Sequence, residues 1–222
     1  MSLYPNLVWL HLLLLVLWLG GDLGVFILGQ HFRKRSYSLP ERLTILKLLV
    51  ITDLGPRFAW ALMVPLSISL VAVGGWWPDL PGWVVAASWV IGLGWSWLVW
   101  DAHAHDMTPR AARNRRYEGW LRYALAVFYI GLGALSLGTG APLAETWLGL
   151  KALMFGVIFV AAIMIDQTFK PVGPQLMALI EKGSSDATEV PLRATMDATR
   201  RWVLAVYALL FVTSWLGSVK PF

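Results

Sequence analysis

Two titratable side chains, His11 and Asp22, interrupt the first long apolar segment of the chain, WLHLLLLVLWLGGDLG at residues 9–24. Ionisable groups inside a membrane-spanning helix are costly and usually face the interior of a bundle or a cavity. The two positions are 11 residues apart. At 3.6 residues per turn this returns them to nearly the same helix face, about 16 Å apart along the axis. The spacing therefore predicts one polar stripe along this helix.

His11 is an imidazole in an apolar setting, and that chemistry suits three roles. The ring can fix the packing of two helices through a hydrogen bond, bind a metal ion, or serve as an axial ligand of haem. No second histidine lies at a comparable depth in the apolar segments, so haem ligation by two histidines is disfavoured. If haem binds, the other axial position is open or is filled by a residue of another type.

Lys151 is the natural counterpart of His11, because it lies five residues inside the outer end of the apolar segment 146–166. Both segments are expected to cross from outside to inside, so the two side chains should lie at a similar depth. A lysine buried without a partner is costly. We therefore weigh two interpretations: a pocket shared with His11, and an amine that reaches the outer interface on its own alkyl stem.

Further ionisable residues lie towards the inner ends of the apolar segments. Asp22 is the candidate proton acceptor, since a buried carboxylate can exchange a proton near neutral pH. Arg57 follows Asp53 by four residues, a spacing that favours an ion pair on a helix, although a guanidinium can also hold the carboxylate of a ligand. Four residues at a similar depth could form one polar cluster: Asp22, Arg57, Asp101 and Asp166.

Other chemistries leave weaker traces. The stretch WDAHAHD places His103 and His105 two positions apart, which puts them on different helix faces, so we interpret it as a hydrated helix end rather than a metal site. Gly-rich phosphate loops, GxSxG elbows and HExxH motifs are absent from the sequence, which disfavours the enzymes that use them. The chain has no cysteine, and this excludes disulfides, thiolate metal sites and cysteine nucleophiles.

The elements that must position these residues are membrane-spanning helices. The 222-residue chain is 58% hydrophobic, its mean hydropathy is +0.63, and apolar runs near membrane-spanning length recur along it. The alternation expected of a transmembrane β-barrel is absent. We therefore predict an all-α, polytopic transmembrane bundle that forms a single domain over residues 1–222. Spans are expected at residues 6–29, 57–75, 83–103, 119–138, 146–166 and 201–218.

Two segments between the expected spans have their own predicted structure. The apolar segment 41–53 is too short to cross a membrane, so it should form an interfacial helix or an extension of the second span. Residues 167–200 are predicted to form a cytoplasmic loop with only short amphipathic helices near 174–182 and 190–199. Its predicted interruptions are Pro171, Pro174, Gly183 and Pro191.

The basic residues of the loops predict the orientation of the chain in the bilayer. The loops after the first, third and fifth spans carry arginine and lysine, whereas WWPDLPG and LGTGAPLAE carry neither. This is the positive-inside pattern, so both termini should face outward from a bacterial inner membrane. The net charge of +5 is then explained by topology, and a nucleic-acid partner is not expected.

The first span also resembles a known family. His11, Trp18 seven positions later and Gly20-Gly21 are similar to the first span of the HemJ-type membrane protoporphyrinogen oxidases and of the related CopD-type copper resistance proteins. His31 at the end of this span is similar to the histidine that closes the same span in the HemJ type.

Two later segments extend the resemblance. Glu41-Arg42, followed by an apolar run and Pro56, is similar to the start of the family's second span, with a longer spacing here. The segment WLGLK at 147–151 is similar to the Trp-x-x-x-Lys motif that opens a later span of the family. The HemJ type is a shorter, four-span protein, whereas six spans are expected in this chain.

The resemblance implies that His11 is the axial ligand of a bound haem b, and that Lys151 acts in the same pocket. With His11, Trp18 and Arg57 are the residues expected to contact the cofactor. Lys151 and Asp22 are the expected catalytic residues. The expected function is redox chemistry, either oxidation of a porphyrinogen or electron transfer to a membrane carrier. Two alternatives remain: a permease-like transporter of copper or a small solute, and a non-catalytic accessory subunit of a membrane complex. The oligomeric state, including a homo-oligomer, stays open.

Overall fold

The computed structural model describes residues 3–222, and every regular element in that range is an α-helix. In chain order the helices are α1 (Leu3–Phe32), α2 (Leu39–Thr52), α3 (Leu54–Val73), α4 (Gly82–Ala104), α5 (Pro109–Thr139), α6 (Thr146–Phe169), α7 (Val172–Lys182) and α8 (Asp186–Val219). Within these residues six helical segments are long and apolar enough to cross a membrane. The prediction of an all-α protein with six potential spans is confirmed.

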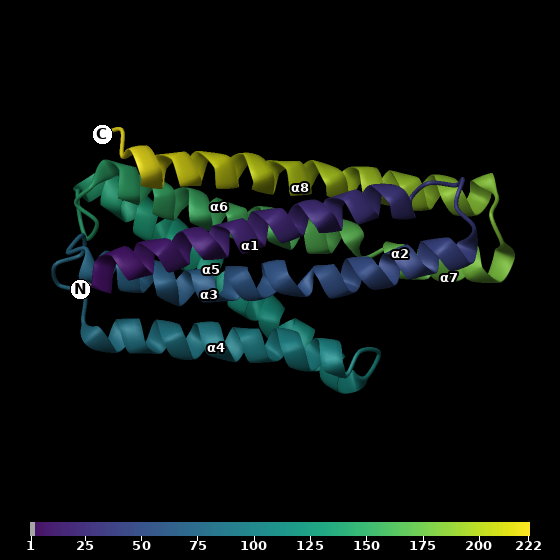
Figure 1. Cartoon of the computed structure of the whole chain (residues 1–222), viewed down its shortest axis with the longest axis horizontal. Helices are drawn as coiled ribbons and strands as arrows, with labels where there is room; N and C mark the ends of the chain where they lie inside the picture. The colour runs from purple at the N-terminus through teal and green to yellow at the C-terminus, as the bar shows by residue number, and fades with distance from the viewer. Residues whose placement is uncertain (1–2) are drawn as a thin grey trace.

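The long helices run side by side along the longest axis of the molecule (Figure 1). Both chain termini lie at one end, which we call the terminal end, and α2, α7 and the start of α8 lie at the other. Because the arginine- and lysine-rich connections lie at this second end, we call it the basic end. Six helical segments that run in alternate directions bring the end of α8 back to the end at which α1 starts (Figure 1).

Local sequence signals explain where several helices begin and end. The side chain of Thr108 accepts a hydrogen bond from the Ala111 backbone N–H, and Pro109 occupies the first position of α5; both features are typical of a helix start. The helix α5 ends at Gly140, whose φ of 73° lies in the left-handed region that glycine adopts without strain. Such signals set helix lengths independently of the neighbouring helices.

Neighbouring helices pack in the order α4, α3, α1 on one side and α4, α5, α6, α8 on the other, and α1 also touches α8. Small residues allow the closest of these approaches. A Cβ at Gly156 in α6 would lie 2.7 Å from the backbone nitrogen of Ile130 in α5. Glycine at such a contact is characteristic of helices that associate in membranes.

The outer surface of the bundle is apolar. Large hydrophobic side chains such as Val90 in α4, Val127 in α5 and Phe211 in α8 are more than half exposed. Charged side chains, by contrast, include several that are almost fully buried, among them Glu118 and Arg122. Apolar residues outside and polar residues within suit a helical protein whose surrounding solvent is lipid.

The structure differs from the sequence expectation in two connecting segments. Residues 41–53 belong to α2, which runs almost directly into α3, so Leu39–Val73 forms one helical segment of 35 residues. This is the extension of the second span and not an interfacial helix.

Residues 190–199 are not a separate short helix within a loop over 167–200, because α8 begins at Asp186 and runs to Val219. Pro191 lies inside α8, in its second turn, so the helix continues through a residue that lacks one backbone hydrogen-bond donor. The long loop expected over 167–200 is therefore mostly helical, with α6 reaching Phe169 and α7 following it.

Candidate functional site

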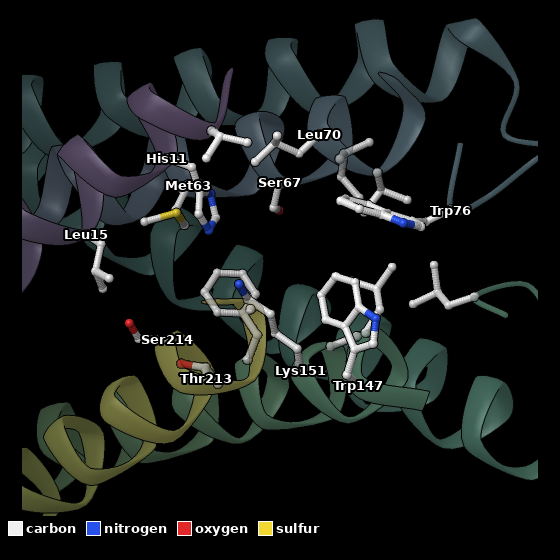
Figure 2. Close-up of a pocket in the computed structure, with 18 of the residues that line it drawn as sticks. His11, Leu15, Met63, Ser67, Leu70, Trp76, Trp147, Lys151, Thr213 and Ser214 are labelled. Atoms are coloured by element: carbon white, nitrogen blue, oxygen red, sulfur yellow. The ribbon is translucent and has the colours of Figure 1, made fainter. Parts of the chain in front are cut away.

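A cavity of about 430 Å³ lies in the terminal-end half of the bundle, where side chains from α1, α3, α5, α6 and α8 converge (Figure 2). Its lining is mainly aliphatic and aromatic. No aspartate or glutamate of residues 3–222 lines it. The polar lining residues other than tyrosine and tryptophan are His11, Ser67, Lys151, Thr213, Ser214, Ser218 and Lys220.

The helix α1 contributes one continuous face to the cavity. Tyr4, Val8, His11, Leu15 and Trp18 all line it, and they are spaced alternately by four and three residues. Residues at these spacings share one side of an α-helix. The predicted stripe of α1 is therefore the wall of the cavity over its first half.

His11 points its ring into the cavity (Figure 2). The Nδ1 atom is buried and has no hydrogen-bond partner among the residues that the structure describes. Buried ring nitrogens are normally hydrogen-bonded, because an unpaired one loses its interaction with water and gains nothing in return. The sequence allowed His11 to fix helix packing through a hydrogen bond to another helix. The Nδ1 atom forms no such hydrogen bond within residues 3–222.

Lys151 reaches into the same cavity from α6 (Figure 2). Within residues 3–222 the amine forms no ion pair, since no carboxylate lies within ion-pair distance of it. The second lysine of the lining, Lys220, is placed differently. Its Nζ lies 4.7 Å from the ring centroid of Trp76 and 5.2 Å from that of Trp147, so two indole faces hold it by cation–π contacts.

Aromatic side chains close the cavity towards the basic end. Trp18 is only 4% exposed and stacks on Trp60, with 5.6 Å between ring centroids. Tyr129 packs edge to face on Phe155 at 4.7 Å, and its hydroxyl lies 3.5 Å from that of Ser67. These rings form one end of the cavity, which we call the aromatic floor.

Beyond the aromatic floor lies a second polar region, which we call the inner cluster, in which Glu118 and Arg122 are buried and Asp166 is about half exposed. It consists of Asp53 and Arg57 at the α2–α3 junction, Glu118 and Arg122 in α5, and Asp166 in α6. The Arg57 Nε donates to the Asp53 Oδ2 at 2.5 Å, and Arg122 donates both to Glu118 and to Asp166. Every charged residue of the inner cluster therefore has an opposite charge beside it.

The inner cluster is connected to the aromatic floor. The Trp95 Nε1 donates to the Glu118 Oε1 at 3.1 Å, and the Arg122 guanidinium lies 5.1 Å from the centroid of the Trp60 ring. Trp95 and Trp60 are in turn 4.9 Å apart, edge to face. The buried charges and the cavity are thus separated by a layer of tryptophan.

The structure divides the residues predicted to form the site. His11, Trp18 and Lys151 line one cavity. Asp22 and Arg57 are outside its lining; the backbone carbonyl of Asp22 accepts a hydrogen bond from the Tyr207 hydroxyl at 2.8 Å, and Arg57 belongs to the inner cluster. Any role of Asp22 or Arg57 must therefore act from beyond the aromatic floor.

The single polar cluster that the spacing allowed is divided as well. Asp101 lies in the last turn of α4 and accepts hydrogen bonds from two residues of α5, from Arg110 at 2.7 Å and from Asn114 at 2.6 Å. The His105 Nδ1 lies 3.3 Å from the same carboxylate. Through Asp101 and Asp106, which pair with Arg110 and Arg115, the WDAHAHD stretch takes part in a salt-bridged turn. Within residues 3–222 no group of three or more histidine or acidic residues could hold a metal ion.

Sequence reasoning missed Glu118 and Arg122, which are each 5% exposed at the side chain. The expected fourth span began at residue 119, and this placed Glu118 in a hydrated loop. The available signal was their spacing, because an acid four residues before an arginine marks one helix face. The same argument was applied to Asp53 and Arg57, where the structure contains the expected pair.

Arg42 was interpreted as a topology signal, and the structure gives it a further role at the basic end. Its Nη1 donates to the Glu189 Oε1 at 2.8 Å and its Nε to the Phe32 carbonyl oxygen at 2.8 Å. Both side chains of the pair are almost fully buried. This contact holds α1, α2 and α8 together.

No protein-family model, curated protein or solved structure matches this chain.

Proposed function

We propose that the chain is an integral membrane protein that binds haem b, or a related porphyrin, in the cavity between α1 and α6. Its role would be redox chemistry in the membrane, either oxidation of a porphyrinogen or transfer of electrons to a membrane carrier. One observation carries the proposal: an imidazole is directed into an apolar, aromatic cavity, and its buried Nδ1 has no protein partner. An imidazole nitrogen that no protein group engages would be available to a haem iron as an axial ligand.

The other lining residues also suit haem b. A haem site needs an axial ligand, flat apolar walls and a polar group near the edge that carries carboxylates. Here His11 would be the ligand, Trp18 and Phe155 would form walls, and Lys151 would lie near the carboxylates. Bound haem would supply one-electron redox chemistry, while the aromatic floor would exclude water from the cavity on its inner side.

We further propose that the protein lies in a bacterial inner membrane with both termini outside the cytoplasm. The support is the positive-inside rule applied to the basic end, where Arg33 and Arg35 leave α1 and Lys182 ends α7. The cavity would then lie in the outer half of the bilayer. Because the chain has no cysteine, a maleimide that cannot cross the membrane should label Asp79→Cys in intact cells and leave Lys182→Cys unlabelled; the reverse result would refute this orientation.

The proposed cofactor is tested by the visible spectrum of the purified full-length chain, expressed with a haem precursor. We expect a Soret band that is lost in His11→Ala and retained in His103→Ala, because only His11 lines the cavity. A protein that stays colourless under these conditions, or one whose band survives in His11→Ala, would refute the proposal.

One observation favours the copper alternative, in which the protein binds or transports copper. Met63 lines the cavity together with His11 (Figure 2), and a thioether with an imidazole is a donor pair that copper accepts. Copper content measured after purification, in the wild type and in Met63→Leu and His11→Ala, tests this function. Copper that both substitutions remove, in a protein without a Soret band, would favour copper over haem. A protein with neither copper nor haem would favour the accessory subunit.

A further inference from the structure

The charges around the cavity do not balance. Its lining holds two lysines and no carboxylate of residues 3–222. Lys220 is held over the rings of Trp76 and Trp147 at the terminal end, which leaves Lys151 as the lysine that faces the interior. An ammonium that is partly removed from water and has no counter-charge is costly, so a group of opposite charge in the cavity would be bound favourably.

The face of α8 opposite Lys151 has two hydroxyls and no bulk between them. Ser214, Gly217 and Ser218 all line the cavity, and their i, i+3, i+4 spacing places them on one side of the helix. Any Cβ at Gly217 would overlap the Nζ of Lys151. Gly217 therefore leaves room for the ammonium to lie against α8, between the two serine positions.

The two serines also have free hydrogen-bonding capacity. Hydroxyls on a helix commonly donate to the carbonyl one turn earlier, as Thr213 does to Leu209. The hydroxyls of Ser214 and Ser218 form no hydrogen bond to residues 3–222, and the Ser214 hydroxyl points towards the cavity (Figure 2). We call Lys151, Ser214, Gly217 and Ser218 the α6–α8 cradle.

From this arrangement we infer that the natural ligand of the cavity is an apolar carboxylic acid whose carboxylate is bound by the α6–α8 cradle. One ammonium balances the single charge of a carboxylate, whereas a phosphate monoester carries nearly two charges. The two serine hydroxyls can donate to the carboxylate oxygens beside the ammonium, which is the charge-assisted arrangement that anions prefer. The aliphatic and aromatic remainder of the lining requires that the rest of the ligand be apolar.

The inference rests on the proposed function only in placing the ligand in this cavity, and it does not depend on iron. It assigns α8 a part in ligand recognition, separate from the metal-binding part assigned to His11 on α1. The two roles can therefore fail independently, and the experiment below separates them.

The test compares each acid with its uncharged ester, using the full-length chain in one detergent. The probes are protoporphyrin IX against its dimethyl ester, and the fluorescent fatty acid cis-parinaric acid against its methyl ester. The quantity is the ratio of the two dissociation constants, ester over acid, in the wild type and in each variant. Comparing variants in the same detergent cancels the partitioning of the probes into micelles.

We expect the wild type to prefer at least one acid over its ester by about tenfold or more, because loss of a desolvated charge partner commonly weakens binding by at least that factor. The ratio should fall towards one in Lys151→Met. It should fall partly in Gly217→Ala, which displaces the amine without removing its charge, and in Ser214→Ala with Ser218→Ala. Gly94→Ala, a glycine whose Cβ would meet nothing within 4 Å, is the matched control and should leave the ratio unchanged.

The ratio in His11→Ala should equal that of the wild type. A preference for cis-parinaric acid in a protein without a Soret band would refute haem binding and support the cradle. A Soret band together with ratios that Lys151→Met does not change would refute the cradle and leave haem binding intact. Equal affinity of the wild type for acid and ester with both probe pairs would also overturn the inference.

Discussion

The cavity and the inner cluster are two polar regions of one bundle, separated by the layer that Trp18 and Trp60 form. In the inner cluster each guanidinium faces a carboxylate, as Arg122 does with both Glu118 and Asp166. In the cavity the Nδ1 of His11 has no partner in the described residues, and no acid lies beside Lys151. Both regions contain charged or titratable groups, and a cavity of about 430 Å³ adjoins those of the first.

The paired charges of the inner cluster stabilise the packing of helices, whereas the unpaired groups of the cavity are available to a ligand. A buried ion pair is sustained by its own members, and removing one of them strands the other in a medium of low polarity. Removing an unpaired group beside a cavity leaves no opposite charge without its partner. Substitutions should therefore act on stability in the inner cluster and on binding in the cavity, and the following predictions test this distinction from the largest effect to the smallest.

Arg122→Met should cause the largest loss of stability. It leaves Glu118 buried with the Arg57 Nη1, 3.9 Å away, as its remaining cation, and breaking a buried pair typically costs about 3–5 kcal/mol. Thermal unfolding of the detergent-solubilised chain measures the effect. The double variant Arg122→Met with Glu118→Gln should regain part of the loss. A loss no greater than that of Arg115→Met, which removes an exposed arginine, would contradict a structural role for the inner cluster.

His11→Leu should have an effect of opposite sign in protein purified without added haem. The substitution removes a buried nitrogen that has no partner, and an unsatisfied buried polar group costs about 1–3 kcal/mol. We therefore expect a gain in thermal stability of about 1 kcal/mol, together with loss of the Soret band in haem-loaded preparations. His103→Leu outside the cavity is the control for both readouts. A clear loss of stability in His11→Leu would show instead that this side chain is a packing residue.

The smallest effect is expected at the exposed pair of Asp106 and Arg115 between α4 and α5. The hydrogen bond from Arg115 lowers the pKa of the Asp106 carboxyl below its ordinary value. The stabilisation is therefore present above the unfolded-state pKa and is lost as the pH falls through the folded-state pKa. An exposed pair contributes under about 1 kcal/mol.

Asp106→Asn should accordingly be slightly less stable than the wild type at neutral pH, and the difference should vanish in acid. Melting temperatures of the two proteins over a pH series, from neutral to below about pH 4, measure this. A difference that persists unchanged at the lowest pH would show that the carboxylate charge is not its source.

The elements of the bundle were largely predictable because their signals are local. Apolar length defined the six spans, and the spacing of His11 and Asp22 predicted a stripe along one face of α1. The joined helices α2 and α3, and the early start of α8, were harder to predict. Proline and polar residues in both segments favour a break, and only their packing against α1 and α7 shows that helix continues through them.

The site was predictable in part. The depths of His11 and Lys151 can be counted from the ends of their segments, so their meeting was a reasonable expectation. The residues that α8 contacts could not be predicted, because nothing in the order of residues says that Gly217 will face the amine of Lys151. Contacts between helices far apart in the chain depend on how each helix is rotated about its axis, and that rotation is set by packing.

By itself the sequence determined the class of the protein: an all-α bundle with six apolar segments, basic connections on one side and an ionisable stripe on its first helix. These properties follow from hydropathy and helical periodicity, which each segment carries alone. Only the tertiary structure decided which ionisable groups would be paired. It brought Asp166 to Arg122 and left Lys151 facing a cavity, because a charge can be neutralised only by the side chains that the folded helices place beside it.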